Sequence, residues 1–318
     1  MASSSSSSSS WPRFLFPNPN SFITALDVVI LLTGVYLAYN EYSGMGLQYS
    51  KFAVAGLHER NEQKSKQKKK EKVFQFKSKT GMLLFYAPAD CIAILFLAYS
   101  LSCYIVAGQL PMFLHALTEL PGIATSHLKQ YCTSDFDYRL LALAAAFSIH
   151  FSKRVLEVLF LHRFSGTTGG WDTFKISMLY AIVVGSLLCT QVLSFSLPGT
   201  SSPTIDLKGL GVSLFLLGIC GNFYHHYLLS CLREDGNNKN KYVVPHGGLF
   251  KLLVCPHYVF EIIDFFGMAT ISQTILGFCC TFVVVVYLTG RTSQTKKWYA
   301  KKVEGFPQDR KILIPKVY

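Results

Sequence analysis

Long apolar runs follow one another along most of the chain, separated by short polar segments. An α-helix rises 1.5 Å per residue, so about 20 apolar residues cross the roughly 30 Å hydrocarbon layer of a bilayer. The runs cover residues 21–39, 82–107, 138–161, 174–197, 207–232, 249–271 and 274–288. They predict an all-α fold, a polytopic membrane bundle of about seven transmembrane helices. The boundary between the last two helices is the least defined.

The composition supports a membrane protein. Half of the 318 residues are hydrophobic and only 15% are charged. The first run contains Asp27 and is followed by no small-residue cleavage site, which predicts a retained helix rather than a signal peptide. The nine cysteines have no paired spacing of the zinc type, so they indicate neither disulfides nor a metal.

The basic residues are clustered, and they predict how the chain crosses the membrane. Lysines crowd residues 41–80, whereas residues 108–137 contain Lys129 alone and residues 198–206 contain no Lys or Arg. Basic loops stay in the cytosol, so we expect a lumenal N-terminus and a cytosolic C-terminus. The net charge of +12 points to contact with membrane lipids, not with nucleic acid, because no basic fold with interleaved aromatic residues accompanies it.

Three regions follow from these patterns. Residues 1–20 are rich in Ser and Pro and are predicted to be disordered. Residues 21–136 form an N-terminal transmembrane region with a basic cytosolic loop at about 41–80. Residues 137–318 form a C-terminal region that carries most of the candidate chemistry.

Polar groups inside the apolar runs concentrate in residues 221–265. They fall near one face of each of two successive helices: Asn222, His226 and Arg233 on the first, and His257, Glu261 and Asp264 on the second. A polar side chain inside a membrane helix costs a few kcal/mol, so it usually faces a protein-lined cavity. The two stripes predict a cofactor pocket. Interhelical hydrogen bonding that only holds the bundle together is the alternative.

A second polar group lies toward the end of the third run. Lys153 and Glu157 have the i, i+4 spacing of a helical ion pair. Arg154 and Arg163 are suited to phosphate, because a guanidinium binds phosphate oxygens in pairs. Basic residues near a helix end also reach headgroups without any function, and for Arg163 the two interpretations are equal. Lys153 and Arg154 lie deeper, which favours a functional role.

Proton transfer, metal binding and nucleotide binding each have candidate residues or motifs. Tyr258 adjoins His257 and could donate a proton or simply pack. The histidines form no HxxxH or HxxHH box, so we expect no metal. No GxGxxG lies in a βαβ context, which excludes nicotinamide binding in the Rossmann manner.

Taken together, the motifs resemble those of the steroid 5α-reductase family, which includes the very-long-chain trans-2-enoyl-CoA reductases. The signature N…LR…Y-x-I-P-x-G-G-L-F…C-P-N-Y…E is similar to Asn222, Leu232-Arg233, the stretch YVVPHGGLF at 242–250, CPHY at 255–258, and Glu261. The ending from Lys297-Trp298-Tyr299 to Ile314-Pro315 is also similar to the family's tail. The resemblance covers about residue 141 to the end.

This resemblance implies a multi-pass protein of the endoplasmic reticulum membrane that holds NADPH on its cytosolic side. Its activity would be that of an oxidoreductase acting on a CH–CH group. Hydride would pass to a carbon–carbon double bond conjugated to a carbonyl in a lipid substrate, either a trans-2-enoyl-CoA or a 4-en-3-one steroid. A role in lipid or steroid metabolism would allow a complex with other lipid-elongation or sterol enzymes.

Site residues carry over from the family by position. Asn222, Arg233 and Tyr242 match cofactor-binding positions. The polar stripes add His226, His257 and Glu261 to that set, and the end of the third run adds Arg163. Lys153, Arg154 and Tyr258 match residues of the enoyl-CoA branch, in which the tyrosine is the expected proton donor.

Four departures from the family pattern keep the substrate open. Tyr86 stands where steroid 5α-reductases have a Glu, and Phe151 stands where they have a Tyr; His257 and His226 replace an Asn and an Asp. In the steroid geometry Tyr86 alone would bind the carbonyl oxygen, whereas in the enoyl geometry Tyr258 would donate the proton, which we favour. A membrane methyltransferase of the isoprenylcysteine type and a non-catalytic lipid-binding relative are the alternatives.

Overall fold

The computed structural model describes residues 12–45, 74–105, 138–162, 167–196, 202–232 and 243–313. Three predicted site residues, Arg163, Arg233 and Tyr242, lie outside these ranges. So do most of the lysine-rich loop and the predicted lumenal loop at 108–137. Residues 12–20, predicted to be disordered, pack at one end of the bundle, where the side chain of Phe16 is buried and its backbone N–H donates to the carbonyl of Gln273 at 2.8 Å.

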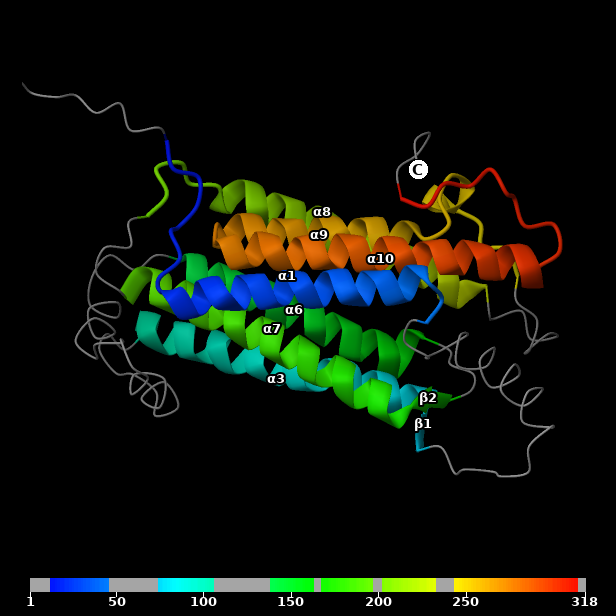
Figure 1. Ribbon diagram of the computed structural model, residues 1–318, viewed down its shortest axis with the longest axis horizontal. Coiled ribbons are helices and arrows are strands. Elements are labelled where there is room, and N and C mark those ends of the chain that lie inside the picture. The colour runs from blue at the N-terminus through cyan, green and yellow to red at the C-terminus, as the bar shows by residue number, and fades with distance from the viewer. Residues whose placement is uncertain are drawn as a thin grey trace, which may run out of the picture.

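Seven α-helices in the described part of the chain lie side by side along the long axis of the molecule (Figure 1). They are α1 (Ser21–Tyr42), α3 (Ser78–Ile105), α6 (Arg139–Leu156), α7 (Gly170–Ser196), α8 (Lys208–Cys231), α9 (Pro256–Ser272) and α10 (Ile275–Lys302). Five of them, α1, α3, α7, α8 and α10, are long and apolar enough to cross a membrane. Each predicted run has become a helix, but α6 and α9 are shorter, with 18 and 17 residues.

The predicted bounds of the last two helices were wrong. Residues 249–255 were expected to begin a helix, but Gly248–Lys251 form a short 3-10 turn, η2, and α9 begins only at Pro256. Proline is favoured in the first helical turn because its missing N–H has no partner there. The helix predicted to end at residue 288 continues to Lys302, so α10 is about 42 Å long and exceeds a bilayer core.

One small sheet departs from the predicted all-α fold. Strand β1 (Gln75–Lys77) pairs antiparallel with β2 (Thr167–Gly169), and Gln75 lies opposite Gly169. The ribbon connects the start of α3 with the start of α7 at one end of the bundle (Figure 1). Short strands give no periodic hydrophobic pattern, which is why the sequence did not predict them.

Glycines allow α8 and α9 to approach closely. A Cβ added to Gly218 would lie 2.4 Å from the backbone nitrogen of Asp264, and one added to Gly267 would lie 2.4 Å from that of Phe215. Small residues at such positions let the backbones of membrane helices come into contact. The backbones of the two helices that carry the polar stripes therefore pack directly against each other.

Ion pairs of buried arginines connect helices near both ends of the bundle. Arg291 of α10 pairs with Glu41 of α1 at 2.7 Å. Near the other end, Arg139 of α6 donates to Asp206 at 3.0 Å and to the side chain of Gln273 at 2.8 Å. Charges so deeply buried require partners, and these pairs connect elements that are distant in sequence.

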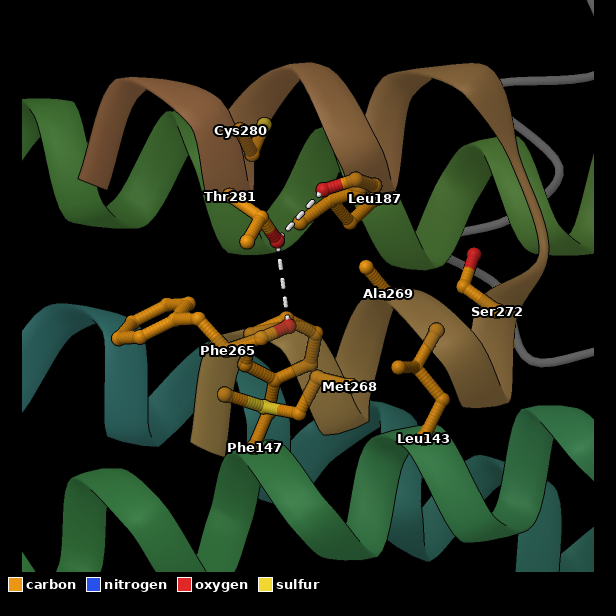
Figure 2. A pocket seen from close by; sticks show the side chains of 10 residues that line it. Leu143, Phe147, Leu187, Phe265, Met268, Ala269, Ser272, Cys280 and Thr281 are labelled. Carbon is orange, nitrogen blue, oxygen red and sulfur yellow. Dashed lines mark hydrogen bonds between the residues drawn. The ribbon is translucent and has the colours of Figure 1, made fainter. Parts of the chain in front are cut away.

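The largest apolar core lies between the helices and encloses a narrow gap (Figure 2). Residues of α6, α7, α9 and α10 line it, among them Phe147, Leu187, Phe265 and Met268. The hydroxyl of Thr281 is its main polar group, and it already donates to the carbonyls of Phe265 and Gly277. The gap is an imperfection of packing between apolar side chains and lies outside the polar cluster described next.

Candidate active site

Polar side chains from four helices meet in one cluster, toward the start of α3 and the end of α6, and the β-ribbon directly precedes α3. Each of the four helices is otherwise apolar along most of its length. The cluster contains Tyr86 from α3; Lys153 and Arg154 from α6, with Glu157 directly after it; Asn222 and His226 from α8; and His257 and Glu261 from α9. The two predicted stripes and the predicted group on the third run are thus parts of one site.

Glu157 is the centre of the cluster, and only 2% of its surface is exposed. Its Oε2 accepts a hydrogen bond from Nη1 of Arg154 at 2.9 Å and lies 2.9 Å from Nδ1 of His226. Its Oε1 lies 2.8 Å from Nζ of Lys153, which is the ion pair predicted from the i, i+4 spacing. One carboxylate therefore contacts two cations and an imidazole.

Asn222 joins the three helices around the site. Its Oδ1 accepts from Nζ of Lys153 at 2.5 Å. Its Nδ2 donates to the carbonyl of His257 at 2.9 Å and, more weakly, to Oε2 of Glu261 at 3.4 Å. The side-chain amide thus connects α6 to α9 through α8, and both of its polar atoms are used.

Arg154 extends from this centre to Tyr86. Its Nη2 donates to the hydroxyl oxygen of Tyr86 at 2.8 Å, and its guanidinium carbon lies 4.9 Å from the centre of the same ring. The Tyr86 ring stacks on Tyr180 at 5.9 Å, and the ring of Phe151 meets Tyr180 edge-on at 5.7 Å. Phe151, which replaces a tyrosine of the family and so has no hydroxyl, is therefore part of an aromatic wall that it forms with Tyr180 next to Tyr86.

His162 covers the cluster from the chain segment that follows α6. Its ring meets that of His226 edge-on, with 5.0 Å between the ring centres. Burial, together with the nearby His226 and Arg154, lowers the pKa of His162 to about 3. His162 is therefore neutral at physiological pH.

Two other histidines, His225 and His150, form contacts between structural elements of the bundle. Nδ1 of His225 donates to the carbonyl of Gly221, and its Nε2 accepts from the N–H of Leu249 at 3.2 Å. This ring anchors the glycine turn, where Gly247 and Gly248 both have positive φ. Nδ1 of His150 lies 2.6 Å from Oδ2 of Asp264. The Asp264 carboxylate, which was predicted to face the cofactor pocket, therefore contacts a histidine of α6 instead.

Tyr258 lies beside the C-terminal segment. Its ring centre is 4.3 Å from that of His257, and it packs against the small core of Val254, Cys255 and Phe306. That segment is fastened by the guanidinium of Arg310, which donates to the carbonyl of Pro245 at 2.8 Å. The C-terminal segment thus packs over the glycine turn and the start of α9.

Sequence reasoning found most of the cluster but missed its centre. Asn222, His226, His257 and Glu261 were predicted as part of one pocket and Lys153 and Arg154 as a separate group, and the structure brings all six together with Tyr86. Glu157 was predicted only as a partner of Lys153, and His162 was not predicted as a site residue. The i, i+3 spacing from Arg154 to Glu157 was the available signal for a second ion pair.

The same cluster contains potential metal ligands. Ligand atoms of Glu157, His162 and His226 lie within 4.8 Å of one another. However, Nη1 of Arg154 lies 2.9 Å from the Glu157 oxygen and 3.0 Å from Nδ1 of His226. A guanidinium already occupies the position that a cation would take, so this donor set does not favour a metal.

Comparisons with known proteins indicate which family the chain is similar to. The profile of the 3-oxo-5-alpha-steroid 4-dehydrogenase family matches residues 173–318. The human 3-oxo-5-alpha-steroid 4-dehydrogenase 1 is 31% identical over 209 residues, which is 62% of this chain and 76% of the human protein.

Two relatives with other names have comparable sequence identities to this chain. A very-long-chain enoyl-CoA reductase of Dictyostelium discoideum is 30% identical over 176 residues, 53% of this chain, and the match spans 55% of that enzyme's length. Polyprenal reductase 1 of Arabidopsis thaliana is 26% identical over 227 residues, 61% of this chain and 71% of the relative. A multi-pass bundle with a buried polar cluster, a profile match over its C-terminal half and long matches to such enzymes together show that the chain belongs to the 3-oxo-5-alpha-steroid 4-dehydrogenase family of oxidoreductases.

Proposed function

We propose that the protein is a membrane-bound, NADPH-dependent reductase of a carbon–carbon double bond conjugated to a carbonyl in a lipid substrate, acting in the endoplasmic reticulum membrane. The observation that carries the proposal is the buried polar cluster around Glu157, which lies inside an otherwise apolar bundle of a reductase family. The family supplies the reaction class, and the cluster supplies groups suited to it.

The residues present fit an anionic nucleotide. Two cations, Lys153 and Arg154, lie in the cluster, and Nε of Arg154 is buried with no hydrogen-bond partner among the described residues. An unused donor on a guanidinium suits an incoming oxygen ligand. The same site would be lined by Asn222, His226, His257 and Glu261. Three further predicted cofactor residues are near these in sequence: Arg163 comes after Glu157, and Arg233 and Tyr242 come after His226.

NADPH would supply the hydride, which reaches the β-carbon of the substrate. Charge then develops on the carbonyl oxygen until a proton reaches the α-carbon, so a donor at that oxygen lowers the barrier. Tyr86 is the group that the structure equips best for this role. Its oxygen accepts from Arg154, and accepting a hydrogen bond from a cation makes a hydroxyl a stronger donor.

Tyr258 is the second candidate donor, by its match to the enoyl-CoA branch. It lies against His257, whose backbone carbonyl accepts from Asn222, so it adjoins the same site from α9. Two assignments of these hydroxyls to carbonyl binding and proton donation are consistent with the proposal. Either Tyr86 binds the carbonyl oxygen while Tyr258 supplies the proton, or Tyr86 does both.

Three substrate classes satisfy this chemistry: trans-2-enoyl-CoA, 4-en-3-one steroids and polyprenals. Each has a double bond conjugated to a carbonyl, and each corresponds to the name of a relative. The departures at Tyr86 and Phe151 favour a substrate other than a steroid. Phe151, which packs against Tyr180, has no hydroxyl. Of the two positions that would bind a steroid ketone, Tyr86 is therefore the one that carries a polar group.

The test is NADPH consumption by the purified protein in lipid nanodiscs with each of the three substrates. We expect turnover with at least one of them, and loss of turnover in Lys153→Met. Lys301→Met, which changes an exposed lysine at the end of α10, is the matched control and should behave like wild type. Methyl transfer from S-adenosylmethionine to an isoprenylcysteine, or binding without turnover, would replace the proposal with one of its two alternatives.

A further inference from the structure

We propose that Glu157 is the positioning residue of this site: one buried carboxylate that fixes Lys153, Arg154 and His226 in their working arrangement. The inference rests on the proposed reductase function. It assigns to Glu157 no contact with substrate or cofactor. Its effect passes through the three groups that it holds.

The contacts of Glu157 account for most of the order in the cluster. Lys153 and Arg154 are adjacent in sequence and carry like charges, so they repel each other unless a carboxylate lies between them. Among the described residues, Glu157 is the one carboxylate within ion-pair distance of either cation. Without it, Arg154 would lose the partner that directs its other nitrogen toward Tyr86.

A local change of helix type places Glu157 for this role. Residues Glu157–Leu161 form a π-helical turn, and the N–H of His162 donates to the carbonyl of Glu157 at 2.7 Å. That bond joins residues five apart, so both lie on the same side of the turn. In a regular α-helix, residues five apart would point about 140° away from each other.

The π-turn therefore lets Glu157 and His162 contact the same partner, His226. Glu157 binds Nδ1 of His226, and the ring of His162 packs edge-on against the same imidazole. Turns of this type cost helix stability and occur often at functional sites. The amino group of Lys79 supports the turn by donating to the carbonyl of Leu159 at 2.9 Å.

A double-mutant cycle tests the proposal. Glu157→Gln keeps the shape and removes the charge, and Arg154→Met removes one partner. If Glu157 acts through Arg154, each single change should lower kcat by about 10²-fold, because a small misplacement of reacting groups has that effect. The double variant should then be no slower than the slower single variant. Glu157→Asp should recover at least tenfold over Glu157→Gln.

The thermal midpoint of the same four proteins gives a readout that needs no activity. We expect non-additive shifts there too, because the contact exists whether or not substrate turns over. Glu304→Gln, an exposed carboxylate in the C-terminal segment, is the matched control and should change neither quantity. Additive losses of kcat, or wild-type kcat in Glu157→Gln, would overturn the positioning role.

Two further outcomes are distinguishable. A wild-type protein with coupled midpoints but no reduction of any substrate would contradict the proposed function and leave Glu157 with a structural role only. A stoichiometric metal ion that is present in wild type and absent from His162→Gln would overturn the proposal, since the three ligands would then serve that ion.

Discussion

At the scale of single residues, the site depends on partners that lie far apart in the sequence. Tyr86 and Arg154 are 68 positions apart, and Asn222 contacts His257 35 positions later. The presence of polar residues in apolar runs predicted a site. Which of them would touch could not be predicted, because it depends on how four helices rotate against one another.

Changing each candidate hydroxyl separately identifies the donor. Tyr86→Phe removes the oxygen that Arg154 contacts and little volume, so we expect kcat to fall about 10²–10⁴-fold, the range for a positioned acid. If Tyr258 supplies the proton, Tyr258→Phe should produce that loss, and Tyr86→Phe should mainly raise KM. Steady-state kinetics with saturating NADPH separate the two. Near-normal rates in both variants would mean that neither hydroxyl takes part.

His162 should make the folded protein sensitive to acid. Its pKa of about 3 in the folded state lies below the ordinary value near 6.5, so the unfolded chain takes up a proton there first. The stability that depends on neutral His162 is complete above pH 6.5 and decreases as the pH falls toward 3. Between pH 6.5 and pH 5 this amounts to at most about 2 kcal/mol.

The measurement is the thermal midpoint across that pH range. His162→Gln should lose part of the wild-type decrease, whereas His246→Gln, in an exposed position of the glycine turn, should follow wild type. Identical curves for wild type and His162→Gln would show that His162 takes up its proton equally in both states.

At the scale of elements, the helices were largely predictable and their ends were not. Seven apolar runs became seven helices because hydrophobic length is a strong signal. The start of α9 was missed although Pro256 marks it, because the apolar residues 249–255 continue the pattern without a break. The π-turn has no signature in composition, and its consequence for Glu157 and His162 appears only in three dimensions.

The close contact of α8 with α9 gives a prediction at this scale. In Gly218→Ala the new methyl group would meet the backbone of Asp264, so the helices must separate. We expect a loss of about 1–3 kcal/mol in stability and weaker NADPH binding, because Asn222 lies one turn away on α8 and contacts His257 of α9. Thermal denaturation and cofactor titration in nanodiscs measure both.

Gly209 on the same helix provides the control. A Cβ there would have open space around it, so Gly209→Ala should leave both quantities unchanged or slightly raise the stability. Equal effects of the two substitutions would show that helix propensity, and not the contact between α8 and α9, determines the outcome.

At the scale of the whole molecule, the chain is a helical bundle with the β-ribbon and the C-terminal segment at one end (Figure 1). The polar cluster lies toward the same end, because it includes residues near the start of α3 and the end of α6. The charge pattern predicts that this end faces the cytosol, and that prediction stands untested. If it is correct, a soluble nucleotide and a membrane-dissolved substrate reach the cluster from different sides. Buried pairs such as Arg291 with Glu41 hold the surrounding helices in place.

The most direct test of the account follows the hydride itself. The purified protein is given NADPH deuterated at the transferable position of the nicotinamide, with the substrate that turns over best, and the product is analysed by mass spectrometry and NMR. The account predicts one deuterium at the β-carbon, an unlabelled α-carbon that takes its hydrogen from solvent, and an intact carbonyl group. Deuterium on the carbonyl carbon, or a product without deuterium, would contradict it.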